Sequence, residues 1–362
     1  MKLETKIASL ILCLALPLTT ACKKTPIPAE DPQPAEIGFT AASQAVWVKS
    51  GETSTPSFPH DDFGVWGIAR QEGLQTPYVL WGTNSLALVE ESSTPGIYSP
   101  SSPAYWMKGY KYNFLAIAPF ADAGLSSIGI TTKEDQLTTI PPAENPVDYM
   151  TFTYDMSTKY TGIPATETTP AAAPDYTFDL LAAAAEQEVK TGGYNTAKEL
   201  KFWHLFAQLS IKVIFENVTG TVEALSIEEV DTQASFTIKQ NSGSSGNTGT
   251  LSIAMNELQS SETELHFNSS SPTDSEGRWT AHIVPQDITD HTINIKYSVV
   301  GTDDKVTYYN DSISLGSSSP TFYNSNGRYN WTIKINPKGG IGFNVVISDW
   351  NSTNVEDVPD IL

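Results

Sequence analysis

Cysteine is nearly absent from this chain. Only Cys13 and Cys22 occur among its 362 residues. A mature chain that begins at Cys22 would hold no second cysteine, so it would form no internal disulfide bond. Its stability then has to come from hydrophobic cores, and the single thiol at its start needs an explanation of its own.

Positively charged residues are also scarce. The chain has 21 Lys and Arg residues against 41 Asp and Glu residues, which gives a formal net charge of −20. Nucleic-acid binding needs Lys and Arg side chains that displace counterions from phosphates. The charge therefore argues against a nucleic-acid partner, while the length favours two domains of about 150 residues each.

The apolar run near the N-terminus is too short to cross a membrane. Ile7–Leu18 is an apolar core of a dozen residues, whereas a membrane-spanning helix needs about 20. It follows Lys2 and Lys6, as the core of a secretory signal follows a short basic stretch. The small residues Thr19–Ala21 then lead directly into Cys22.

This arrangement resembles a bacterial lipoprotein signal, in which residues 1–21 are removed and Cys22 is lipidated as the new N-terminus. Leu18 lies four residues before the cysteine, where such signals usually place leucine three before. The alternative is an ordinary secretory signal followed by a free cysteine. We favour lipidation, because a lone reactive thiol in an exported chain is otherwise unexplained. Two acyl chains would hold the protein firmly at a membrane.

Catalytic signatures are lacking. The chain has no GxSxG elbow, HExxH pair, P-loop or GxGxxG turn. Its five histidines occur singly, and strand alternation places His204, His266 and His282 opposite the apolar face, where we expect solvated or rim positions. Pro59–Phe63 groups one histidine with two aspartates, which fits a polar turn better than a cation site. We therefore expect no catalytic residue, no cofactor and no metal site.

What the chain does contain is period-two alternation, which dominates from Glu36 onward. It is clearest in the segments His291–Val299, Tyr329–Asn336 and Ile341–Ser348. Such segments predict strands with one buried face, as antiparallel β-sandwiches require. Lys201–Val218 is the longest apolar segment, and we predict one continuous strand there.

One segment gives conflicting indications, because the alanines of Tyr176–Val189 favour a helix by propensity while its first residues alternate. We predict a strand at its start. The expected organisation is a lipoprotein signal at residues 1–21, a proline-rich tether at 22–35, an N-terminal β-sandwich domain at 36–199 and a C-terminal one at 200–362.

Several segments together resemble the fimbrillin family, the subunits of type V pili on certain Gram-negative anaerobes, in its fimbrillin-like branch. Leu200–Val213, the preceding Asp179–Ala183 and the strand end Trp279–Gln286 are similar to family segments in the same order. The residues that carry the resemblance are Phe202, His204, Ala207, Leu209, Pro285, Gln286 and Trp350. In this family these motifs serve the fold.

The resemblance implies an all-β protein with two tandem transthyretin-like antiparallel β-sandwich domains, exported as a lipoprotein to the outer membrane. In polymerising members a trypsin-like surface protease removes the tether and the first strand. The emptied groove then accepts a strand from the next subunit. The implied partners are other fimbrial subunits or further copies of this chain, the outer membrane, and a ligand on a host or bacterial surface.

The strand to be removed or donated is expected at Ile37–Val48. Its residues on one face are Ile37, Phe39 and Ala41. The loop that follows holds Lys49 as the candidate cleavage site. The family typically uses arginine there, and the nearest arginine, Arg70, comes after the second strand and is the less favoured site. The short acidic tail after Trp350 is a candidate donor strand.

The leading hypothesis is a non-enzymatic fimbrial subunit that acts in assembly and adhesion. It is a stalk or tip pilin if Lys49 is cut, and an anchor or standalone adhesin if it is not. The alternative is a non-polymerising glycan- or host-binding outer-membrane lipoprotein, which exposed aromatic residues in one patch would favour. A hydrolase would require a cleft with converging carboxylates.

Overall fold

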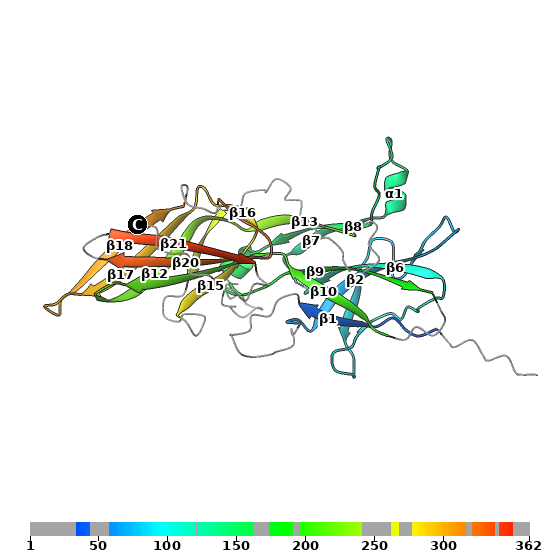
Figure 1. The fold of residues 1–362 in the computed structure, drawn as a ribbon, viewed down its shortest axis with the longest axis horizontal. Helices are drawn as coiled ribbons and strands as arrows, with labels where there is room; N and C mark the ends of the chain where they lie inside the picture. Colours follow the sequence, from blue (N-terminus) through cyan, green and yellow to red (C-terminus); the bar gives the residue numbers. More distant parts are fainter. Residues whose placement is uncertain are drawn as a thin grey trace, which may run out of the picture. The chain divides into compact units, whose positions relative to one another are not determined.

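The computed structural model describes residues 34–43, 58–120, 122–161, 174–190, 196–240, 262–267, 277–315, 321–336 and 340–349 (Figure 1). Within these ranges there are 21 strands and two helices of five residues each. The predicted all-β class is thus confirmed. None of the described helices is long and apolar enough to cross a membrane.

The first sheet closes on itself, because β6 pairs with β9 at the end of the sheet and also with β2 near its beginning. The order is β3-β2-β4-β5-β1-β10-β9-β6. The bounds are β1 (Phe39–Ser43), β2 (Asp62–Gln71), β3 (Tyr78–Val79), β4 (Ala87–Glu91), β5 (Tyr98–Pro100), β6 (Tyr110–Ala118), β9 (Leu181–Val189) and β10 (Lys198–His204). One hydrophobic core contains side chains from most of these strands, including β1.

Three strands of this sheet, β2, β6 and β9, are buried on both faces. In β6 the neighbours Phe114 and Leu115 are both fully buried, and they belong to two different core clusters. Two-sided burial explains why the alanine-rich segment forms β9 and not a helix: its alanines pair with β6 and pack on both sides. Tertiary packing here outweighs helix propensity.

A three-stranded sheet of order β13-β8-β7 contributes to the other hydrophobic core, the one that contains Leu115. Its strands are β7 (Leu125–Thr131), β8 (Tyr149–Asp155) and β13 (Gln233–Lys239), and α1 (Lys133–Leu137) and α2 (Ser157–Thr161) adjoin it in the chain. β13 follows residue 200 and yet pairs with β8, placing Phe236 opposite Phe152. The division of the chain at residues 199 and 200 stays a prediction.

The rest of the described chain forms two four-stranded sheets and a small pair, β16-β19 (Figure 1). The sheets have the orders β15-β11-β20-β21 and β14-β12-β17-β18. The bounds are β11 (Ala207–Phe215), β12 (Thr219–Asp231), β14 (Glu262–Phe267), β15 (Arg278–Ile283), β16 (Gln286–Asp287), β17 (Thr292–Val300), β18 (Val306–Ser314), β19 (Phe322–Tyr323), β20 (Gly327–Asn336) and β21 (Gly340–Asp349). The three strands predicted from alternation are present as β17, β20 and β21.

The predicted continuous strand over Lys201–Val218 is wrong, because two strands occupy it. β10 ends at His204 and β11 begins at Ala207, and the two belong to different sheets. The break also changes which residues face a core. In β10 the even-numbered residues such as Phe202 are buried and Trp203 is only half-buried. In β11 the odd-numbered residues Ala207, Leu209 and Ile211 are buried.

Candidate functional site

The strand β1 lies between β5 and β10 in the closed sheet. Each of its five residues pairs in parallel with a residue of β10, and Phe39 also pairs with Tyr98 of β5. Just before the strand, the Ile37 amide donates a hydrogen bond of 2.8 Å to the Ala104 carbonyl oxygen. β1 is therefore bonded on both sides, but only β10 pairs along its whole length.

The side chains of β1 fill a cavity in the core of the closed sheet. Phe39 is fully buried, and its ring centroid lies 5.2 Å from that of Phe114 and 6.0 Å from that of Phe63, both edge-on. Ile37 is 2% exposed, and Ala41 packs against the same core. The name β1 seat is used below for strands β5 and β10 together with Phe63 and Phe114.

Three predicted site residues lie outside the described residues: Cys22, Lys49 and Trp350. Lipidation of the first and cleavage at the second stay predictions. The structure does describe Arg70, the less favoured cleavage site.

Arg70 is held by two carboxylates. Its guanidinium donates to both carboxylate oxygens of Glu134 at 2.8 and 2.6 Å, and to both of Asp148 at 2.7 Å. The Asp148 side chain is completely buried and also accepts hydrogen bonds from Asn113 and the Lys133 amide. Burial alone would lower the pKa of Arg70, but the two carboxylates outweigh it and raise the pKa. This network joins β2 and β6 to α1 and to the residue just before β8.

The sequence placed His204 and His282 in solvated positions, and both expectations are wrong. His204 is 4% exposed and its Nδ1 lies 2.5 Å from Asp179 Oδ2, while His282 is 7% exposed with Nδ1 2.9 Å from the Phe178 carbonyl oxygen. Burial lowers the pKa of His282, although the Asp179 carboxylate opposes this. His266 is solvent-exposed, as predicted.

The Asp179–His204 contact joins two of the motifs that the sequence had singled out. The two residues are 25 positions apart, and the pair links the segment before β9 to the end of β10. Sequence reasoning treated the histidine by itself, since strand alternation assigned it to a solvated face. The presence of both residues in two neighbouring motifs is the signal from which the contact could have been predicted.

The remaining described motif residues are also buried. They are Phe202, Ala207, Leu209, Pro285 and Gln286. The Gln286 side chain accepts a hydrogen bond of 2.8 Å from the Asp231 amide and donates one of 2.9 Å to the Val284 carbonyl oxygen. It thereby satisfies backbone groups that burial would otherwise leave unpaired.

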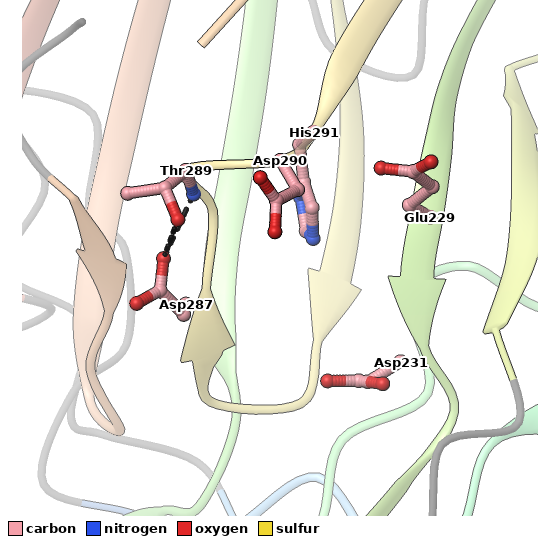
Figure 2. A pocket seen from close by; sticks show the side chains of 6 residues that line it. All are labelled: Glu229, Asp231, Asp287, Thr289, Asp290 and His291. Carbon is pink, nitrogen blue, oxygen red and sulfur yellow. Dashed lines mark hydrogen bonds between the residues drawn. The ribbon is translucent and has the colours of Figure 1, made fainter. Parts of the chain in front are cut away.

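An acidic hollow of about 660 Å³ lies beside β12 and β16 (Figure 2). It is lined by Glu229, Asp231, Asp287, Thr289, Asp290 and His291. The Asp287 carboxylate accepts hydrogen bonds from the Thr289 amide and hydroxyl. Burial lowers the pKa of His291 to about 4 despite the nearby Asp287 and Asp290, so its ring is neutral at pH 7.

The carboxylates of this hollow are spread around it, as Figure 2 shows. In the part of the chain that the structure describes, no three His, Cys, Asp or Glu side chains are arranged to hold a metal ion. His60 is not grouped with Asp61 and Asp62 in such a site either. Among the described residues, the β1 seat is therefore the candidate functional site, and the strand β1 of the same chain occupies it.

The model of the family described as Fimbrillin-like matches residues 55–350. A fimbrial protein from Bacteroides vulgatus ATCC 8482 is 13% identical, with a TM-score of 0.46 over 86% of this chain and 99% of that one. The tip fimbrial protein Mfa3 from Porphyromonas gingivalis is 9% identical, with a TM-score of 0.35 over 87% and 99%. No curated protein matches the chain.

Proposed function

Since the chain belongs to the fimbrillin-like family, we propose that it is a structural and adhesive subunit of a cell-surface fimbrium. Its role in this proposal is non-enzymatic. Proteolysis removes β1 together with the tether, and an extended strand of the next subunit then occupies the β1 seat. Subunits would be joined by backbone hydrogen bonds and by apolar side chains in the seat, which is the physics of strand addition.

The β1 seat carries this proposal. Phe39 of the short strand β1 enters the core, as does Ile37 two residues before it, so a donor strand with the same alternation can replace both. Loss of β1 would leave β10 with an unpaired edge and would expose the rings of Phe63 and Phe114 to water. Both consequences are unfavourable, and a donor strand relieves both.

Cleavage is assigned to Lys49 rather than Arg70. A cut after Arg70 would interrupt β2, which pairs with both β4 and β6, and the guanidinium is already held by Glu134 and Asp148. A cut at Lys49 falls between β1 and β2 and leaves both strands whole. If Lys49 stays intact, the protein keeps its anchor and is a pilus anchor or an adhesin that does not polymerise.

Polymerisation after cleavage is the direct test. Residues 23–362 are treated with a trypsin-like protease, the new N-terminus is read by mass spectrometry, and multimers are sought on detergent gels. We expect a cut near Lys49 and a detergent-resistant ladder. Lys49→Gln should abolish both, whereas Lys201→Gln, at an exposed lysine, should abolish neither. A cut near Lys49 without any multimer would refute strand exchange in this chain.

Lipid anchoring at Cys22 is a separate part of the proposal, supported by the apolar core and small residues before it. In cells that express the full chain, Cys22→Ala should move the protein from the membrane fraction to the soluble fraction, because two acyl chains supply the attachment. Fractionation followed by immunoblotting measures this. Retention of the variant in the membrane fraction would contradict a lipid anchor.

A further inference from the structure

A second hollow lies between the turn that joins β11 to β12 and the β17–β18 hairpin. Its volume is about 670 Å³, and it is open to solvent, because residues 301–310 are all exposed. It is lined by Asn217, Val218, Thr219, Val299, Val300, Gly301, Thr302, Asp304, Thr307 and Tyr309. All of these belong to one chain, so the hollow is complete before any assembly.

The rim of the hollow is held by its backbone. The hairpin turn is closed by hydrogen bonds from the Gly301 amide to the Lys305 carbonyl oxygen and from the Asp304 amide to the Gly301 carbonyl oxygen. Asn217 and Asp304 have φ values of 57° and 60°, a conformation that Asn and Asp tolerate better than most residues. The two turns therefore present their side chains on a defined frame.

One wall of the hollow is an aromatic ring in a fixed position. Tyr309 stacks on Tyr297, with ring centroids 5.1 Å apart and planes inclined by 14°. The Tyr297 hydroxyl donates a hydrogen bond of 2.8 Å to Asp311, which holds the supporting ring in place. Tyr309 is still 38% exposed. A pre-oriented ring of this kind offers a flat apolar surface at little entropic cost.

The polar side chains around this ring are available for hydrogen bonds to a ligand. The side chains of Asn217, Thr219, Thr302, Asp304 and Thr307 make no hydrogen bond to any residue in the described ranges. Three hydroxyls and an amide can thus donate hydrogen bonds to a ligand and accept them from it, and a carboxylate can accept them. In the acidic hollow, by contrast, Asp287 is already bonded to Thr289.

We propose that this hollow binds a neutral saccharide, with a face of the sugar ring against Tyr309 and its hydroxyls bonded to the threonines and Asn217. A sugar presents C–H groups on one face and hydroxyls at its edge, which matches this combination of lining groups. Among the described residues that line the hollow there is Asp304 and no Lys or Arg. An anionic sugar would therefore meet a like charge in a chain of net charge −20.

This inference does not depend on strand exchange, since uncleaved single chains are tested. Residues 23–362 are examined by saturation-transfer difference NMR with methyl β-D-galactopyranoside, methyl α-D-mannopyranoside and N-acetyl-D-glucosamine, and with N-acetylneuraminic acid as the anionic comparison. We expect transfer to at least one neutral sugar and none to the anionic one. No transfer to any of the three neutral sugars would overturn the proposal, as would preference for the anionic sugar.

Adjacent tyrosines provide matched variants for affinity measurements. Tyr309→Ala should weaken the binding of the neutral sugar about tenfold, equivalent to ~1.4 kcal/mol, and Thr307→Val should weaken it several-fold. Tyr308→Ala should leave affinity unchanged, because this side chain is 73% exposed and does not line the hollow. Equal losses in both tyrosine variants, or a loss only in Tyr308→Ala, would overturn the assignment. Thermal unfolding of each variant checks that the fold is retained. If Tyr309→Ala does not fold, the affinity of Thr307→Val tests the assignment.

Discussion

Replacing Phe39 with alanine is expected to lower the free energy of unfolding by about 3–5 kcal/mol, the usual cost of deleting a fully buried phenylalanine ring. The ring contributes the largest side chain of β1 to the core of the closed sheet, where it is edge-on to Phe63 and Phe114. The variant would leave a cavity that this rigid surrounding can close only in part.

Urea denaturation followed by tryptophan fluorescence measures this loss, because Trp81 and Trp106 pack in or against the same core. Thr40→Ala is the matched control on the same strand. Thr40 is only half-buried and has the opposite parity, so its replacement should cost less than about 1 kcal/mol. Equal losses in the two variants would mean that β1 does not fill the core as described.

Replacing Arg70 with methionine is expected to cost about 3–5 kcal/mol, since it leaves the buried Asp148 carboxylate without its main charged partner. The methionine keeps most of the apolar volume, so the loss reports the charge and its hydrogen bonds. The matched control is Lys111→Met. Lys111 lies opposite Arg70 on β6 and forms an exposed ion pair with Glu186, worth less than about 1 kcal/mol.

The contribution of the Arg70 network to the free energy of unfolding should also depend on pH, and the pKa of Glu134 gives the direction. Burial alone would raise the pKa of Glu134, but its hydrogen bonds and charge contact with Arg70 outweigh this, so the pKa is lowered from 4.5. The resulting stability is present above the ordinary pKa and is lost as the pH falls through the lowered one. The difference in unfolding free energy between wild type and Arg70→Met should therefore shrink at low pH. A difference that grows on acidification would contradict this account.

Stability and assembly make opposite demands on β1. The proposed function needs a strand that can leave, whereas Phe39 is among the most thoroughly buried residues of its core. In the proposed function, cleavage between β1 and β2 would resolve this conflict, because it would remove the covalent link between the strand and the rest of the chain while leaving the seat intact. A donor strand could then replace β1.

The sequence alone identified the all-β class and the position of most strands, because period-two alternation is a local property. It also singled out Ile37 and Phe39 by their shared parity, and both are buried. Family membership could be recognised from ordered motifs that include His204 and Gln286. The sequence did not indicate the Arg70 network, since Glu134 and Asp148 lie 64 and 78 residues from the arginine.

Only the tertiary structure decided how the middle of the chain is divided and which faces are buried. The residues Leu205 and Phe206 interrupt an apparently continuous strand, so β10 and β11 enter different sheets with opposite buried parity. His204 is therefore buried against Asp179. Alternation predicts that one face is buried but not where a strand changes partners, because that depends on which surfaces meet from distant parts of the chain.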